Sequence, residues 1–180
     1  MILYHGTILE SGRDIVLNGI NLNKCREYSD FGKGFYTTPD KSFAEICAMT
    51  KAGVSNKSRR PVIVRFEADW ERVRGHQYFD KADVNWGQFI INNRTSNKYL
   101  LSVNTGIHNK DLKYHIVQGP TADARITDMV NEFEKLNKPV SDDDIQKFKS
   151  HIFGEQISFH TEIALSLLKN ATIIDIERRV

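Results

Sequence analysis

DFGKGFYTT, residues 30–38, places two glycines around a lysine and follows them with an aromatic pair and two threonines. These letters suit a phosphate-binding loop, a surface turn or the wall of a slot that binds a flat ring. The stretch is no Walker A loop, because Gly32-Lys33-Gly34-Phe35 lacks both the G-x-x-x-x-G-K-[ST] spacing and the hydroxyl after lysine. It does not fit G-x-G-x-x-G either, and a tight turn is the simplest interpretation of GKG by itself.

The composition around this stretch describes one ordinary globular domain of 180 residues, 40% hydrophobic and 27% charged. The net charge of +2 indicates no polyanionic partner, although basic residues gather in SNKSRR (55–60) and at the ERRV end (177–180). A solvated loop and a chain end explain these two clusters at least as well as nucleic acid does.

The cysteines and the apolar runs indicate the cellular compartment of the protein. Cys25 and Cys47 show no CxxC and no metal-ligand spacing, so we expect free thiols in a reducing compartment and no metal site. We expect no signal peptide, and no apolar run approaches the ~18 residues that cross a bilayer. It therefore predicts a cytoplasmic protein without a membrane partner.

Strands and helices are mixed along the chain. The alternation of apolar and polar residues is clearest in PVIVRFEA (61–68). Strands are expected over 1–5, at the end of DFGKGFYTT, and over 61–68, 113–119, 155–160 and 171–177. Helices are expected over 8–19, 40–52, 85–94, 127–136, 141–153 and 161–170. This order has no regular βαβ rhythm, repeat or linker, and it predicts a single α+β domain over residues 1–180.

Taken singly, the most distinctive residues have ordinary explanations. Tyr36 suits a half-buried strand aromatic, and His5 suits a hydrogen-bonded histidine at the edge of the core. Gly6 indicates only a positive φ or a close approach of another group to the backbone. Their combination and their order carry more information than any one of them.

LYHGT (3–7), NGI (18–20), FGKGFYTT (31–38) and KSFAEICA (41–48) follow one another at the N-terminal end. This order resembles the catalytic domain of the poly(ADP-ribose) polymerases. There a His-Gly-Thr strand precedes a Gly-Leu turn, a Phe-Gly-Lys-Gly-Ile-Tyr strand and a helix that begins with Lys-Ser. HGT alone is a weak signal, whereas HGT with FGKGxY at this separation is a strong one.

The remainder resembles a family of small bacterial proteins in the ADP-ribosyltransferase superfamily, through WGQFIINNR (86–94), YHIVQGPTAD (114–123) and EQISFHTEIALSLLK (155–169). Together the resemblance spans nearly the whole chain. It implies the fold of that superfamily: two packed, mainly antiparallel sheets that form a split NAD cleft, with peripheral helices. It also implies an NAD-dependent mono-ADP-ribosyltransferase that uses NAD as a co-substrate.

The resemblance implies a role for each matching residue. His5 corresponds to the histidine that hydrogen-bonds an NAD ribose hydroxyl. Gly6 corresponds to the glycine whose bare backbone pairs with the carboxamide, and Tyr36 to the tyrosine that stacks on the nicotinamide face. Ser42 is the candidate second carboxamide donor, although the loop that leads to it from Tyr36 is two residues shorter than in the polymerases.

Other positions complete the expected NAD-binding set. Phe43 is the candidate second stacking aromatic, because Glu45 occupies the usual position. Thr7 and Gly34 belong to the two motifs themselves. Arg94 has two interpretations: it grips the NAD diphosphate bidentately, or it forms a surface ion pair.

The third catalytic position of the family is usually a glutamate on a late strand, and here it corresponds to Gln156. A glutamine can hold a ribose hydroxyl, but it has no charge to stabilise an oxocarbenium ion or to take a proton. Glu155 faces the other way by strand alternation unless a bulge brings it in. Asp123 is either an acceptor-side base or a turn-stabilising residue. Trp86 is expected as an aromatic of the core or of a lid rather than as a substrate contact.

Three functions follow from these expectations. The first is a mono-ADP-ribosyltransferase of the bacterial toxin type, with an unknown protein or nucleic-acid acceptor and a neutralising partner protein. The second is a catalytically weak or inactive module that binds NAD or ADP-ribose. The third is a transferase that modifies nucleic acid. Chain elongation is not expected, because it requires an acid at the third position.

Overall fold

The structure is a computed structural model that describes residues 1–53, 59–70, 73–96, 108–122, 126–136, 141, 143–144 and 154–176. Its elements in chain order are β1 (Ile2–Ile8), α1 (Leu9–Asn18), η1 (Leu22–Lys24), β2 (Phe35–Thr37), α2 (Lys41–Ala52), β3 (Pro61–Ala68), β4 (His76–Tyr78), α3 (Val84–Arg94), β5 (Ile116–Pro120), α5 (Ile126–Leu136), β6 (Glu155–Phe159), α7 (Glu162–Leu165) and β7 (Leu168–Asp175). Strands and helices are mixed, and the expected α+β class is confirmed.

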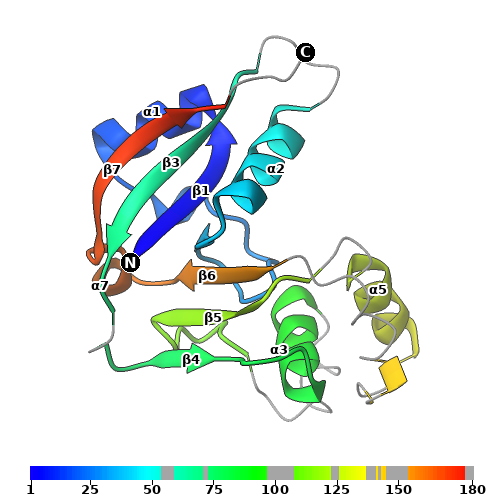
Figure 1. Ribbon diagram of the computed structural model, residues 1–180. Coiled ribbons are helices and arrows are strands. Elements are labelled where there is room, and N and C mark those ends of the chain that lie inside the picture. Colours follow the sequence, from blue (N-terminus) through cyan, green and yellow to red (C-terminus); the bar gives the residue numbers. More distant parts are fainter. Residues whose placement is uncertain are drawn as a thin grey trace.

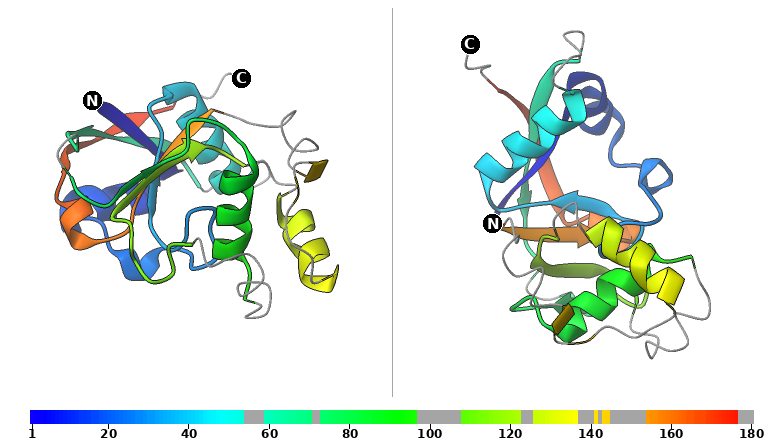
Figure 2. Two further views of the ribbon diagram at one scale, coloured as in Figure 1. Left: turned by 90° about the horizontal axis from the view of Figure 1, so that it is seen from below. Right: turned by 90° about the vertical axis from the view of Figure 1, so that its right-hand side faces the viewer.

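The first sheet is antiparallel and has the strand order β1-β3-β7 (Figure 1). Gly12 of α1 lies beside the side chains of Val62 and Val64 on one face of β3. Gly6 of β1 lies against the backbone of α2. Because neighbouring strand positions face opposite ways, and Gly6 pairs with Ile63, α1 and α2 cover opposite faces of this sheet (Figure 2).

The second sheet has the order β2-β6-β5-β4, in which β4 and β5 are parallel and the other pairs antiparallel. Both sheets are therefore mainly antiparallel, as expected. They meet where the edge of β1 reaches the end of β2. There Tyr4 donates its backbone N–H to the Thr38 carbonyl at 2.8 Å, and Thr38 donates back at 2.9 Å.

Two apolar clusters hold these layers together. One contains side chains of both sheets, among them Leu3, Phe35, Val64, Phe66, Ile116, Ile157 and Phe159. The other lies between the second sheet and helices α3 and α5, with Phe31, Phe89, Ile90, Val117, Met129 and Phe133. Trp86 belongs to this second cluster and donates its indole N–H to the Pro120 carbonyl at 3.0 Å, so its expected place in the core is confirmed.

The helix expected over residues 161–170 is wrong beyond its first turn. α7 ends at Leu165, and Leu168 begins β7, which pairs along β3 with Lys169 opposite Glu67. The apolar pattern of this expected helix predicts that Ile163 lies in the core, but Ile163 is 62% exposed. The apolar pattern of 161–170 was misleading, because the Leu-rich start of β7 also fits a helical period. Pairing with β3 makes this segment a strand. Of the helix expected over 141–153, only 141, 143 and 144 lie among the described residues.

Within the described part of the chain, no helix combines the length and the apolar character that a membrane crossing requires.

Candidate functional site

The junction of the two sheets brings the expected catalytic residues onto three neighbouring strands. His5 of β1 lies with Nδ1 2.6 Å from the backbone carbonyl of Tyr36 in β2. Tyr36 pairs with Ser158 of β6, and Gln156 lies two positions before Ser158 on the same face of that strand. Residues 5, 36 and 156 therefore share one region of the fold.

His5 has a fixed tautomer. Its Nδ1–H donates to the Tyr36 carbonyl, because a carbonyl can only accept. Its Nε2 lies 3.3 Å from the Lys51 ammonium, which can only donate, so Nε2 is an acceptor. The ring stacks on Phe35 with 4.4 Å between the centroids. Burial and the Lys51 charge lower the pKa of His5 to about 3, and the imidazole is neutral at physiological pH.

Gly6 presents its backbone to the free edge of β1. The N–H and C=O of Tyr4 point to that edge and bond Thr38, so those of Gly6, two residues on, point the same way. The Gly6 carbonyl accepts a hydrogen bond from Lys51 Nζ at 2.7 Å. A Cβ on Gly6 would lie 2.0 Å from the Ala44 carbonyl oxygen. Glycine is thus required here for the approach of α2, so of the two explanations expected for Gly6 the close approach to its backbone is confirmed.

Tyr36 anchors the loop that precedes it. Its hydroxyl accepts the Phe31 N–H at 2.8 Å and donates to the Gly32 carbonyl at 2.7 Å. Its ring lies 6.4 Å from the Phe31 ring and 6.4 Å, edge-on, from that of His160. Burial raises the pKa of Tyr36 well above its usual value, and the phenol stays protonated. The residue as a whole is only partly buried.

The remaining motif residues have structural partners of their own. A Cβ on Gly34 would lie 2.6 Å from Nδ1 of His160, whose ring fills the space that this glycine leaves. Thr7 is buried on β1, on the side where α1 packs. Ser42 and Phe43 begin α2, and their N–H groups bond Asp40 Oδ1 at 2.8 and 3.2 Å.

Asp30 is a site residue that the sequence reasoning missed. Asp30 is buried, with a side chain that is only 8% exposed. Arg94 donates to Oδ1 from Nε at 2.7 Å and approaches it with Nη2 at 2.6 Å, and Gln156 Nε2 donates to Oδ2 at 2.9 Å. Of the two interpretations of Arg94, the structure places it in an ion pair, and the pair is largely buried rather than on the surface.

This network fixes the amide of Gln156. Because a carboxylate only accepts, the amide nitrogen must face Asp30, and the carbonyl oxygen Oε1 is turned away from it. Gln156 can therefore offer a hydrogen-bond acceptor to a ligand. Glu155 is on the other face, as expected, and accepts from Gln118 Nε2 at 2.7 Å.

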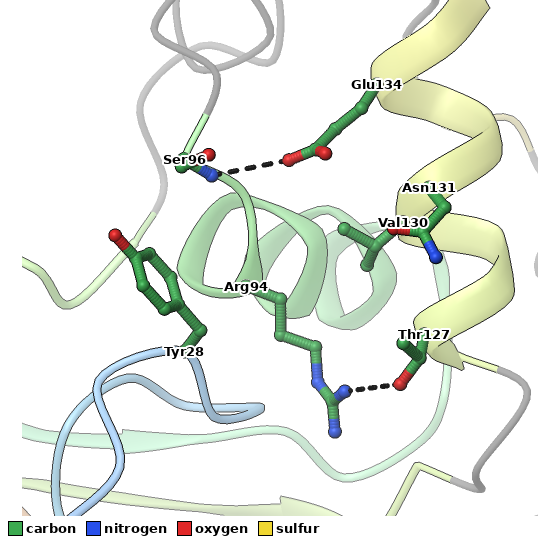
Figure 3. A pocket seen from close by; sticks show the side chains of 7 residues that line it. All are labelled: Tyr28, Arg94, Ser96, Thr127, Val130, Asn131 and Glu134. Atoms are coloured by element: carbon green, nitrogen blue, oxygen red, sulfur yellow. Dashed lines mark hydrogen bonds between the residues drawn. The ribbon is translucent and has the colours of Figure 1, made fainter.

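Arg94 also lines a cavity of about 340 Å³ between the end of α3, α5 and the loop at Tyr28 (Figure 3). Its Nη1 donates to Thr127 Oγ1 at 3.0 Å across this cavity, and Glu134 accepts from the Ser96 N–H at 3.3 Å. The lining carries both charge signs, so it shows no preference for an anion alone.

Several expected positions fall elsewhere. Asp123 lies outside the described residues, as do 55–58 and 177–180 from the two basic clusters. Arg60, at the end of the first cluster, pairs with Asp175 at 2.8 Å. Cys25 and Cys47 are free thiols, and burial raises the pKa of each.

The lowered pKa of His5 predicts acid sensitivity. Between the ordinary value of 6.5 and the folded value of about 3, the unfolded chain binds a proton that the native chain does not. The free energy of unfolding therefore falls as the pH falls through this window, by up to about 1.4 kcal/mol per pH unit from His5. Urea unfolding at pH 6 and pH 5 measures this slope, which His5→Asn should reduce. An equal slope in the variant would contradict the assignment.

The fold and the junction define an α+β domain in which a histidine, a tyrosine and a glutamine lie on three neighbouring strands. Over residues 1–170 the chain matches the family described as "Protein of unknown function (DUF3990)", and it belongs to that family. Neither the curated proteins nor the solved structures contain a significant match to the chain.

Proposed function

We propose that this protein is an NAD-dependent mono-ADP-ribosyltransferase, which cleaves the bond between nicotinamide and ribose and transfers ADP-ribose to a macromolecular acceptor. One observation carries the proposal. His5, Tyr36 and Gln156, separated by up to 151 positions in the sequence, come together on adjacent strands at the junction of the two sheets. The two-sheet architecture is compatible with the fold that the motifs resemble.

The local geometry suits the groups that NAD would present. The edge-facing N–H and C=O of Gly6 form a donor and acceptor pair that matches a carboxamide. His5 Nε2 and Gln156 Oε1 are acceptors for ribose hydroxyls, and the ring of the partly buried Tyr36 would be the stacking surface for nicotinamide. Bond cleavage develops positive charge on the ribose, as in glycoside hydrolysis.

A second candidate function is an NAD-binding module without turnover, and the third position favours it. Gln156 carries no charge, and the nearby Asp30 carboxylate is matched by the Arg94 guanidinium. Gln156, Asp30 and Arg94 together therefore offer little net negative charge to a developing oxocarbenium ion. A protein or nucleic-acid acceptor, a neutralising partner and a cytoplasmic location remain parts of the proposal.

Nicotinamide release from NAD tests the proposal directly. The wild-type protein should release nicotinamide, and His5→Asn and Tyr36→Ala should not. Tyr78→Ala is the matched control, since Tyr78 is an exposed tyrosine of β4. NAD binding without release would favour the module. If the wild type neither binds nor cleaves NAD, both candidates fail.

Exchanging the carboxylate of Asp30 with the amide of Gln156 should increase the rate of nicotinamide release. Gln156→Glu alone would set two carboxylates about 2.9 Å apart, so one of them would hold a proton and no gain is expected. Asp30→Asn combined with Gln156→Glu restores an amide donor to a carboxylate acceptor and puts the charge at the third position. We expect about tenfold faster nicotinamide release from the double variant. Equal rates in the double variant and the wild type would contradict a catalytic third position.

A further inference from the structure

Lys51, on the last turn of α2, turns its ammonium onto β1. Nζ lies 2.7 Å from the Gly6 carbonyl oxygen and 3.3 Å from His5 Nε2. The residue as a whole is exposed, so its stem lies at the surface while its head reaches inward. Desolvation lowers the pKa of this ammonium. A lysine at the end of a helix would ordinarily extend into water.

Lys51 contacts two hydrogen-bond acceptors, and under the proposed function both of them would bind NAD. The Gly6 carbonyl would accept the carboxamide N–H, and His5 Nε2 would accept a ribose hydroxyl. An ammonium has three donors and no acceptor, so it satisfies both groups at once. We propose that the Lys51 ammonium occupies the donor positions of the ligand, and that nicotinamide binds only after Lys51 has left Gly6 and His5. This inference rests on the proposed function.

The surroundings of the ammonium make this displacement feasible. Among the described residues, the charged and titratable groups around it are His5, Arg26, Cys25 and Cys47. None of these is a carboxylate, and Arg26 repels the ammonium. Lys51 is held by hydrogen bonds to neutral acceptors, and its charge regains hydration when it leaves. Its flexible four-carbon stem allows this movement without any change in the backbone.

The competition has a direct consequence for affinity. In the free protein the ligand must first break the two contacts of Lys51, and this requirement weakens binding. Lys51→Met removes the ammonium and leaves an apolar stem of similar length. Nicotinamide is the suitable probe, because it carries the carboxamide but no phosphate, and attraction between Lys51 and a diphosphate cannot affect the result.

The test compares nicotinamide binding to the wild type, to Lys51→Met and to Lys169→Met by calorimetry. Lys169 is an exposed lysine of β7, and it controls for the loss of one positive charge. We expect nicotinamide to bind about tenfold more tightly to Lys51→Met, and Lys169→Met to match the wild type. In a parallel NMR titration, the pKa of His5 should rise above about 3 in Lys51→Met, because one of the two causes of its lowering is gone.

Equal or weaker nicotinamide binding to Lys51→Met would overturn the inference, as would an unchanged pKa of His5. If Lys51→Met does not fold, Lys51→Gln replaces it, since glutamine is neutral and keeps one amide donor group. The affinity of Lys51→Gln for nicotinamide should lie between those of the wild type and Lys51→Met. NAD cleavage by the wild type is scored separately. Cleavage with no gain in Lys51→Met or Lys51→Gln contradicts the role of Lys51 alone. No cleavage and no nicotinamide binding by any variant contradicts both proposals.

Discussion

Replacing Asp30 with alanine is expected to lower the free energy of unfolding by about 3–5 kcal/mol. The Asp30 side chain is 8% exposed, and its carboxylate lies 2.6–2.7 Å from two nitrogens of Arg94. Its removal leaves a largely buried guanidinium without a counter-ion and takes the acceptor from the Gln156 amide. For a domain of this size the loss corresponds to a fall of roughly 6–20 °C in Tm. Thermal and urea unfolding measure both quantities.

The loss of unfolding free energy in Asp30→Ala should come from the Arg94 charge that is left without its partner, rather than from the loss of the ion pair itself. Asp30→Asn combined with Arg94→Gln leaves neither charge alone, and its cost should be well below the sum of the two single costs. The surface pair of Lys24 and Asp14, with side chains 65% and 35% exposed, provides the matched control. Asp14→Ala should cost less than about 1 kcal/mol. Similar losses for Asp30→Ala and Asp14→Ala would refute the interpretation.

Local sequence signals predicted the elements that are stabilised locally. PVIVRFEA (61–68) alternates as a strand must, and it coincides with β3. The helix expected over 40–52 coincides with α2 (Lys41–Ala52) except at Asp40, which is its N-cap. The signals failed where a distant partner decides the conformation. β4 (His76–Tyr78) is three residues long and exists because it pairs in parallel with β5, which no pattern in 76–78 announces.

The site shows the same division between local and distant causes. The motifs located His5, Gly6 and Tyr36, because each lies in a short stretch with a distinctive order. Asp30 could not be found in this way, since its burial depends on Arg94 and Gln156, which lie 64 and 126 positions away. Lys51 resembles any basic residue at the end of a helix, and only the packing of α2 on β1 turns its ammonium toward Gly6.

Gly6→Ala is expected to lower the free energy of unfolding by more than about 3 kcal/mol. The added Cβ would lie 2.0 Å from the Ala44 carbonyl oxygen and 2.7 Å from the Ala48 backbone nitrogen. Both atoms belong to the helical backbone, which cannot rotate away as a side chain can. α2 would have to move off β1, and the contact between Lys51 and the Gly6 carbonyl would be lost with it.

Gly12→Ala is the matched control for this prediction. Its Cβ would approach Val62 Cγ2 at 3.0 Å, a side-chain atom that can shift, and alanine favours a helix interior over glycine by about 1 kcal/mol. The unfolding free energy of Gly12→Ala should therefore stay within about 1 kcal/mol of the wild type. If Gly6→Ala were equally mild, α2 would not pack on β1 as described. If it unfolds the protein, a loss of NAD binding in that variant says nothing about a carboxamide contact, and the Gly6 carbonyl must be tested through Lys51 instead.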